Sequence, residues 1–217
     1  MKTTAPQSQE EYFAATEHAV KHLYAGLDSC WSYYKEAGQY WDLRQLGQPM
    51  TPERREALNN FLELAKKYFS LKFSEATFAG GILQTAYMGI RLYSRNDSIP
   101  ASCAGLVRPE NKSAIPFCIG EYRHGLPLGL IVYAGRNQFS HWDEDKLNPV
   151  NENVFEALSL AHFTDVWHDL AFSLSNPTIN IYAGEILLVA LRWTTYDEYL
   201  TAMKAMLTSP ADAEGTD

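Results

Sequence analysis

An arginine and a histidine stand five positions apart in a short segment that reads Gly-Arg-Asn-Gln-Phe-Ser-His. Arg136 carries a permanent positive charge and a planar set of N–H donors that suits phosphate oxygens. His141 can accept or donate a proton near neutral pH. Asn137, directly after the arginine, can bond to phosphate or ribose and orient the imidazole. Together these side chains have the minimum chemistry for metal-free cleavage of RNA, whose own 2′-hydroxyl is the nucleophile.

The spacing of the two residues suggests a shared site. In a regular helix, side chains at positions 136 and 141 point about 140° apart. They do not share one face, but both can reach one point near a helix end or a kink. One imidazole cannot easily act as base and acid in a single step. The motif is therefore expected to be half of a composite site, which a second copy of the chain completes.

The Arg-Asn-x₃-His pattern resembles the signature of HEPN-domain ribonucleases, in which four to six residues separate arginine from histidine. The resemblance implies an all-α, up-and-down bundle and metal-independent endoribonuclease activity on single-stranded RNA, without a cofactor. Arg136 would bind and polarise the phosphate, Asn137 would position it, and His141 would be the acid or base. The family acts as homodimers in bacterial toxin–antitoxin and antiviral defence systems, so an antitoxin or effector protein is an expected partner.

Three further residues join the predicted substrate-binding set. Ser140 lies within the motif, and Arg123 and His124 precede the motif helix, where they could add positive charge at its start. One feature departs from the family. Some HEPN toxins continue His-x-Tyr, and a nucleotidyltransferase partner modifies that tyrosine. Here the residues after the histidine are Trp142 and Asp143, which places such a partner in doubt but leaves cleavage unaffected.

Two alternatives remain open for the motif. The chain can be a non-catalytic HEPN-like module that acts with a protein or nucleotide partner, or the motif can be a polar pair at a helix end. Metal binding is a third hypothesis, although no zinc-ribbon or HExxH pattern is present. Its candidate ligands are spaced along two helical segments: His18 and His22, and a cluster formed by His162, Asp165, His168 and Asp169.

Composition limits the class of protein. The chain has 217 residues, of which 46% are hydrophobic, enough for a substantial core. Its net charge of −8 opposes non-specific binding to nucleic acid, so any RNA affinity must come from a local positive site. The sequence has no apolar run of membrane-spanning length, and because its first residues lack an apolar segment we expect no secretory leader. Three widely spaced cysteines favour reduced thiols, and we expect a cytoplasmic protein without a membrane partner.

Apolar residues at spacings of three and four predict one helical domain over residues 10–207, between disordered ends at 1–9 and 208–217. Thr51 is expected to cap the second helix with Pro52 at its first position, and Thr194 or Thr195 to cap the last. Gly80, Gly81 and Gly89 would weaken the third helix unless it packs closely on its neighbours. The predicted helices cover residues 10–38, 52–69, 74–93, 127–141, 148–170, 186–193 and 196–207.

Residues 95–126 interrupt the helical pattern with prolines, glycines and polar residues. A structureless connection of that length is uncommon inside a domain. We expect an irregular or short-stranded insertion. Residues 114–119 are a candidate strand, and an ordered functional loop is the alternative.

Overall fold

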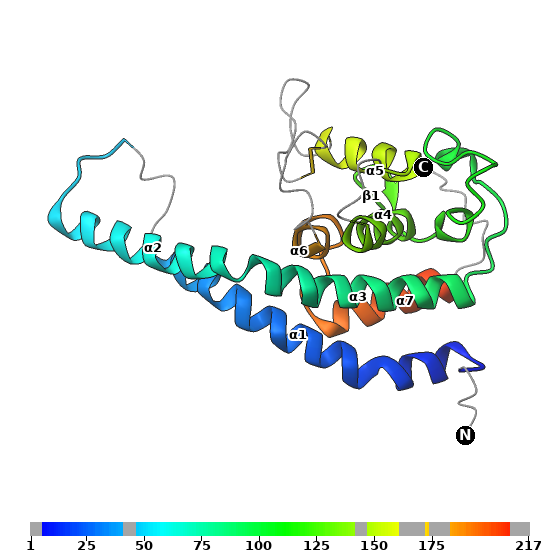
Figure 1. Ribbon diagram of the computed structural model, residues 1–217, viewed down its shortest axis with the longest axis horizontal. Helices are drawn as coiled ribbons and strands as arrows, with labels where there is room; N and C mark the ends of the chain where they lie inside the picture. Colours follow the sequence, from blue (N-terminus) through cyan, green and yellow to red (C-terminus); the bar gives the residue numbers. More distant parts are fainter. Residues whose placement is uncertain (1–5, 41–46, 142–146, 161–171, 174–182, 209–217) are drawn as a thin grey trace.

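Three long helices form the base of the structure, a computed structural model that describes residues 6–40, 47–141, 147–160, 172–173 and 183–208. Helix α1 (Gln9–Tyr40) is antiparallel to α2 (Pro52–Ser70) and α3 (Lys72–Tyr93), which follow one another with only Leu71 between them. The second half of α1 and α2 extend beyond the other helices as a two-helix arm (Figure 1). The predicted cap of α2 is confirmed, because the Thr51 hydroxyl accepts a hydrogen bond from the Arg54 N–H at 3.3 Å.

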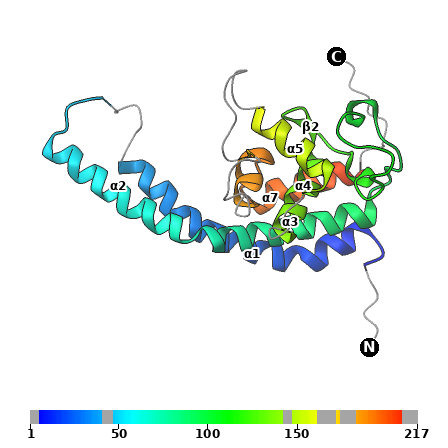
Figure 2. The same ribbon diagram turned by 45° about the horizontal axis from the view of Figure 1, so that its top comes forward.

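The remaining helices pack on the two sides of α3. On one side lie α4 (Leu128–Ser140), α5 (Pro149–Leu160), α6 (Ala183–Glu185) and the π-helical turn η5 (Ile186–Ala190). On the other side, α7 (Tyr196–Thr208) contacts both α1 and α3 (Figures 1 and 2). The expected all-α class is therefore confirmed. No described helix has the length and apolar character needed to span a membrane.

Helix α4 is the central element, because it lies between α3 and α5. Every residue from Leu128 to Gly135 is buried, which explains why this run is apolar on all sides rather than amphipathic. Pro127 takes the N-cap position, so α4 begins at Leu128, one residue after the predicted start at residue 127. The motif residues therefore occupy the last turn of a helix whose first two turns are fixed in the core.

The insertion between α3 and α4 contains two 3₁₀ turns, η2 (Ala101–Cys103) and η3 (Ile115–Phe117), and a hairpin of β1 (Tyr122–Arg123) and β2 (Leu126–Pro127). The prediction of a strand at 114–119 is wrong. Pro116 has no N–H to donate to a neighbouring strand, and the Ile115 carbonyl accepts from the Asn96 amide at 2.6 Å. The short strands lie instead around Gly125, whose φ of +75° suits the tight hairpin turn.

The glycines of α3 mark close helix contacts, as predicted. A side chain at Gly81 would begin 3.0 Å from Leu23 of α1, and one at Gly89 would begin 2.9 Å from Tyr12. A side chain at Gly80 would overlap the ring of Phe139 on α4. The absence of side chains thus lets α1 and α4 approach α3 closely, which offsets the weak helix propensity of glycine.

Helix boundaries agree with the predictions within a few residues where the structure describes them. Helix α3 begins at Lys72 rather than Ser74, and α5 is described as far as Leu160. The predicted continuation of α5 to residue 170 and the turn at 176–177 lie outside the described residues. Thr195 is the cap of α7, and Glu198 completes a capping box by accepting from the Thr195 N–H at 3.0 Å.

Candidate functional site

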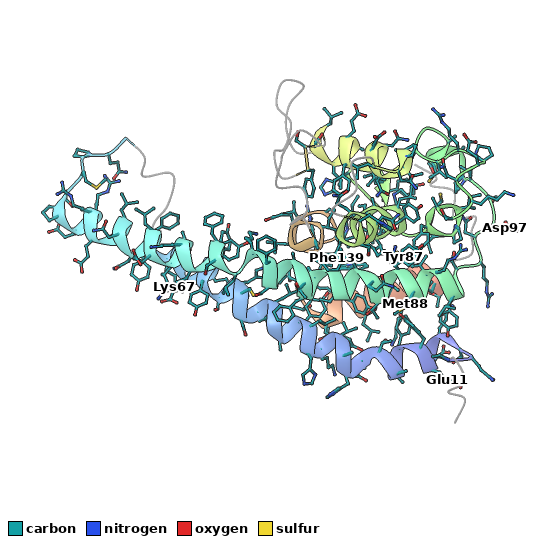
Figure 3. All side chains as sticks on the ribbon, viewed as in Figure 1. Glu11, Lys67, Tyr87, Met88, Asp97 and Phe139 are labelled. Atoms are coloured by element: carbon teal, nitrogen blue, oxygen red, sulfur yellow. The ribbon has the colours of Figure 1, made fainter. Side chains whose placement is uncertain are left out.

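Arg136 lies half-buried on the side of α4 that faces α3. Its Nε donates a hydrogen bond of 2.7 Å to Gln84 Oε1, and its guanidinium lies over the ring of Tyr87, 4.6 Å from the ring centre. Tyr87 and Phe139 lie where α4 crosses α3 (Figure 3). Both contacts fix the guanidinium plane. Arg136 is therefore an oriented cation rather than a freely moving surface side chain.

Asn137 links Arg136 to the next helix. Its Oδ1 accepts a bond of 3.1 Å from Arg136 Nη1, and its Nδ2 donates to Asn151 Oδ1 at 3.5 Å. Asn151 belongs to α5 and is buried. A polar row thus runs from Gln84 on α3 through α4 to α5.

The described partners of Arg136 are all neutral. Gln84, Tyr87 and Asn137 orient its charge without cancelling it. Within the described part of the chain, no carboxylate forms an ion pair with this guanidinium. A half-buried arginine more often pairs with an acid, because burial of an uncompensated charge costs free energy. As far as the described residues go, the charge of Arg136 is not neutralised by a neighbouring acid.

His141 occupies a different position. It is the C-cap of α4, its N–H donates to the Asn137 carbonyl at 2.9 Å, and it is exposed, as is Ser140. Arg136 is turned toward α3, and a residue five positions later in a regular helix points about 140° away. The structure joins Arg136 and Asn137 directly and places His141 at the exposed end of the same helix.

Arg123 and His124 lie at the opposite end of α4, in the hairpin that precedes it. The length of α4 is about 18 Å at 1.5 Å per residue. Arg123 pairs with Glu121 at 3.3 Å, and it also donates to the Leu191 carbonyl. The positive charge that Arg123 was predicted to add at the start of the helix is thus partly neutralised by Glu121. Neither Arg123 nor His124 is next to Arg136.

Sequence reasoning did not find the three residues that orient the motif: Gln84, Tyr87 and Asn151. Gln84 and Tyr87 are three positions apart, so they lie on one face of α3. Nothing in the sequence connects that face with Arg136, because the contact joins residues about 50 positions apart in the chain. The one sign of this polar row in the sequence was Asn151, a polar residue at a buried position of α5.

The candidate metal sites receive no support in the described residues. No group of three or more metal-ligating side chains occurs among them. His18 and His22 lie on an exposed face of α1 with ring centres 4.2 Å apart, and His22 Nδ1 donates to the His18 carbonyl at 2.8 Å. The cluster at 162–169 lies outside the described residues.

A second polar cluster lies where the arm joins the other helices, and sequence reasoning did not predict it. Glu75 is buried on α3, pairs with Lys72 at 2.9 Å, and accepts a bond of 2.9 Å from Trp31 Nε1. Lys72 also contacts Tyr68 and Glu185, at 2.6 and 3.0 Å. Each charge in this cluster has an opposite charge beside it, which indicates a structural junction rather than a site for a ligand.

No protein-family model, curated protein or solved structure matches the chain.

Proposed function

We propose that the protein is a metal-independent endoribonuclease with a HEPN-like helical bundle, which cleaves single-stranded RNA at a site shared by two copies of the chain. The observation that carries the proposal is the state of Arg136. It is half-buried and held by Gln84, Tyr87 and Asn137, all of them neutral. Such a preorganised cation stabilises the charge that develops on phosphorus during cleavage.

Each motif residue has a separate task in this reaction. One His141 removes the proton of the ribose 2′-hydroxyl, whose oxygen then attacks phosphorus. Arg136 binds the non-bridging phosphate oxygens, and Asn137 holds the guanidinium in place. The partner copy provides a second imidazole that protonates the departing 5′-oxygen. The products are a 2′,3′-cyclic phosphate and a 5′-hydroxyl, and each acid or base contributes about 10²–10⁴-fold to the rate.

The exposure of His141 and the net charge of the chain both fit a cleft shared by two copies of the chain. His141 ends α4 in an exposed position, where a second molecule can approach it. The net charge of −8 gives little general attraction for RNA. Affinity would come from the paired motifs or from a bound protein partner. A cytoplasmic toxin or antiviral effector, held inactive by an antitoxin or an activating protein, would fit these requirements.

The test is RNA cleavage by the purified chain in EDTA. We expect cleavage by the wild type, products that end in a 2′,3′-cyclic phosphate, and loss of at least about 10²-fold in rate for Arg136→Ala and His141→Ala. Arg91→Ala and His22→Ala are matched controls, because both residues are exposed and lie away from the motif. A full rate in the two motif variants, or a requirement for a divalent metal, would show that the proposal is wrong.

A non-catalytic HEPN-like module that binds a protein or nucleotide partner is the second candidate. Exposed apolar side chains on α2 and at the start of α3 favour this alternative. Leu62, Phe69 and Phe73 are 52%, 66% and 75% exposed and recur at spacings of seven and four along α2 and α3. A clear absence of cyclic phosphate ends from the wild type, at a protein concentration where it is dimeric, would select this alternative.

A further inference from the structure

The side of α2 that faces away from α1 carries a regular row of exposed side chains. Helix α2 packs on α1, and its buried residues are Leu64 and Tyr68. At about 100° per residue, six side chains point within about 40° of the direction opposite Leu64. We call them the outer row, and all six are exposed: Arg55, Asn59, Leu62, Lys66, Phe69 and Phe73. The row continues into α3, because the Glu75 N–H still donates to the Leu71 carbonyl at 2.9 Å.

The outer row has the pattern of a helix that packs on a second helix. Its members follow one another at spacings of four and three, which is the seam of a coiled coil. A surface helix normally carries polar residues opposite its core. Phe73 and Phe69 are instead the most exposed large hydrophobic side chains that the structure describes, at 75% and 66%. In Figure 1, α2 projects beyond the helices that pack on α3, which leaves room along this face.

The two ends of the outer row have complementary shapes. At the start of α2, Arg55 and Asn59 line an open hollow of about 360 Å³ together with Met50, Pro52 and Glu56. At the other end, the exposed rings of Phe69 and Phe73 have no hollow beside them of their own. An antiparallel second copy would place each end against its complement. A parallel copy would place hollow against hollow and ring against ring.

We propose that the outer row is a homodimer contact, in which a second copy of the chain packs antiparallel with the two-fold axis level with residue 64. In this register the Phe73 ring enters the partner's hollow beside Arg55, and Phe69 packs against Asn59. Lys66 lies over Leu62 at the centre. Each of these contacts occurs twice, because the same surface is used by both copies.

The charges of α2 suit this register. The Arg55 guanidinium would lie against a phenylalanine ring, which is a favourable cation–π contact. Lys66 would come next to Glu63 of the other copy, which is exposed beside the row. A parallel contact would instead place Lys66 against Lys66 and Arg55 against Arg55. Helix α2 is also nearly neutral, with four basic and three acidic side chains in a chain of net charge −8, so repulsion between copies is small here.

The outer row contact is separate from the shared site proposed for RNA cleavage. Arg136 bonds to Gln84, which lies 20 positions beyond residue 64 and thus about 30 Å along the helix. The two motifs would lie on opposite sides of the two-fold axis, about 60 Å apart. The outer row contact therefore does not rest on the proposed ribonuclease activity, and a chain that used both contacts would form assemblies larger than a dimer.

Sedimentation of the purified, full-length chain over a range of concentrations tests the contact. We expect self-association that Phe73→Glu weakens, with a rise of at least about 30-fold in the dissociation constant, because the ring that fills the hollow is lost. Leu92→Glu is the matched control, since Leu92 is 58% exposed on α3 but lies outside the outer row. It should associate like the wild type, and circular dichroism should show that both variants are folded.

Cysteines placed in the outer row test its direction. The native cysteines, Cys30, Cys103 and Cys118, are all buried. A short bismaleimide should join Arg55→Cys chains to Phe73→Cys chains in an equal mixture, whereas neither variant should cross-link by itself. Cross-linking of Phe73→Cys chains to each other would overturn the antiparallel register. A wild type that stays monomeric at about 1 mM would overturn the contact. So would a dimer that persists in Phe73→Glu, which would belong to another surface, such as the paired motifs.

Discussion

The guanidinium of Arg136 lies over the ring of Tyr87, 4.6 Å from its centre, and this stack joins α4 to α3. A cation over an aromatic face contributes about 0.5–2 kcal/mol, depending on its desolvation. In a double-mutant cycle of Arg136→Met and Tyr87→Leu, we expect a coupling of about 1 kcal/mol in the free energy of unfolding, measured in urea. Tyr87→Phe keeps the ring, so it should retain most of the coupling.

We expect the same arrangement to matter for the proposed cleavage of RNA. Arg136→Lys keeps the positive charge but loses the planar set of donors that bonds both Gln84 and Asn137. We expect this variant to fold normally and to cleave RNA about 10²-fold more slowly than the wild type, measured in single turnover. Cleavage at the wild-type rate would show that charge alone is sufficient and that the neutral partners of Arg136 have no catalytic importance.

Gly80 tests the close approach of α4 to α3. A methyl group at this position would overlap the ring of Phe139, whereas one at Gly38 of α1 would meet no atom within 4 Å. We expect Gly80→Ala to lower the free energy of unfolding by about 1–3 kcal/mol through overpacking. Gly38→Ala should raise it by about 0.5–1 kcal/mol through helix propensity. Urea titrations of both variants measure the difference, and equal effects would contradict the contact.

Local features such as helix caps could be predicted from the sequence, whereas contacts between distant segments could not. Thr51 and Thr195 are caps because of the residues within three positions of them, and Gly80 already indicated a close helix contact. The strand expected at 114–119 failed because Pro116 and the Asn96 amide, 19 positions from Ile115, determine the backbone there. The partners of Arg136 were missed for the same reason, since Gln84 is contributed by another helix.

Tyr199 is a buried side chain whose hydroxyl has no hydrogen-bond partner in the described structure. It is only 1% exposed, and its ring packs edge-on against Trp193. A buried hydroxyl without a partner loses its bond to water and gains nothing in return. Tyr199→Phe should therefore raise the free energy of unfolding by about 1 kcal/mol, measured by urea denaturation. A loss of stability of similar size would show that the hydroxyl is hydrogen-bonded.

Buried tyrosines predict a loss of stability in alkali. Burial raises the pKa of Tyr12 and Tyr68 to about 12 and raises those of Tyr24 and Tyr199 as well. Above about pH 10 the unfolded chain releases protons that the folded chain keeps, so the free energy of unfolding falls as pH rises. Urea titrations from pH 8 to 11 should show stability declining above about pH 10, and Tyr199→Phe should decline less steeply.

Lys72 and Glu75 provide the last test, at the junction between the arm and the other helices. Burial opposes the charge of Lys72, but Glu185, Tyr68 and Glu75 outweigh it and raise the pKa of Lys72. Lys72 therefore stabilises the fold up to its ordinary pKa of about 10.4, and this contribution is lost as pH rises through the higher folded value.

At neutral pH, Lys72→Met would leave the Glu75 carboxylate buried without its cation. We expect a loss of about 3 kcal/mol in the free energy of unfolding, measured in urea. Adding Glu75→Gln to that variant should restore part of it, because glutamine is neutral and still accepts from Trp31. Lys21→Met is the control, since its ion pair with Glu17 is exposed and should contribute little. If the effects of Lys72→Met and Glu75→Gln on the free energy of unfolding were additive, Glu75 and Lys72 would not be energetically coupled. The junction would then be held together by packing alone.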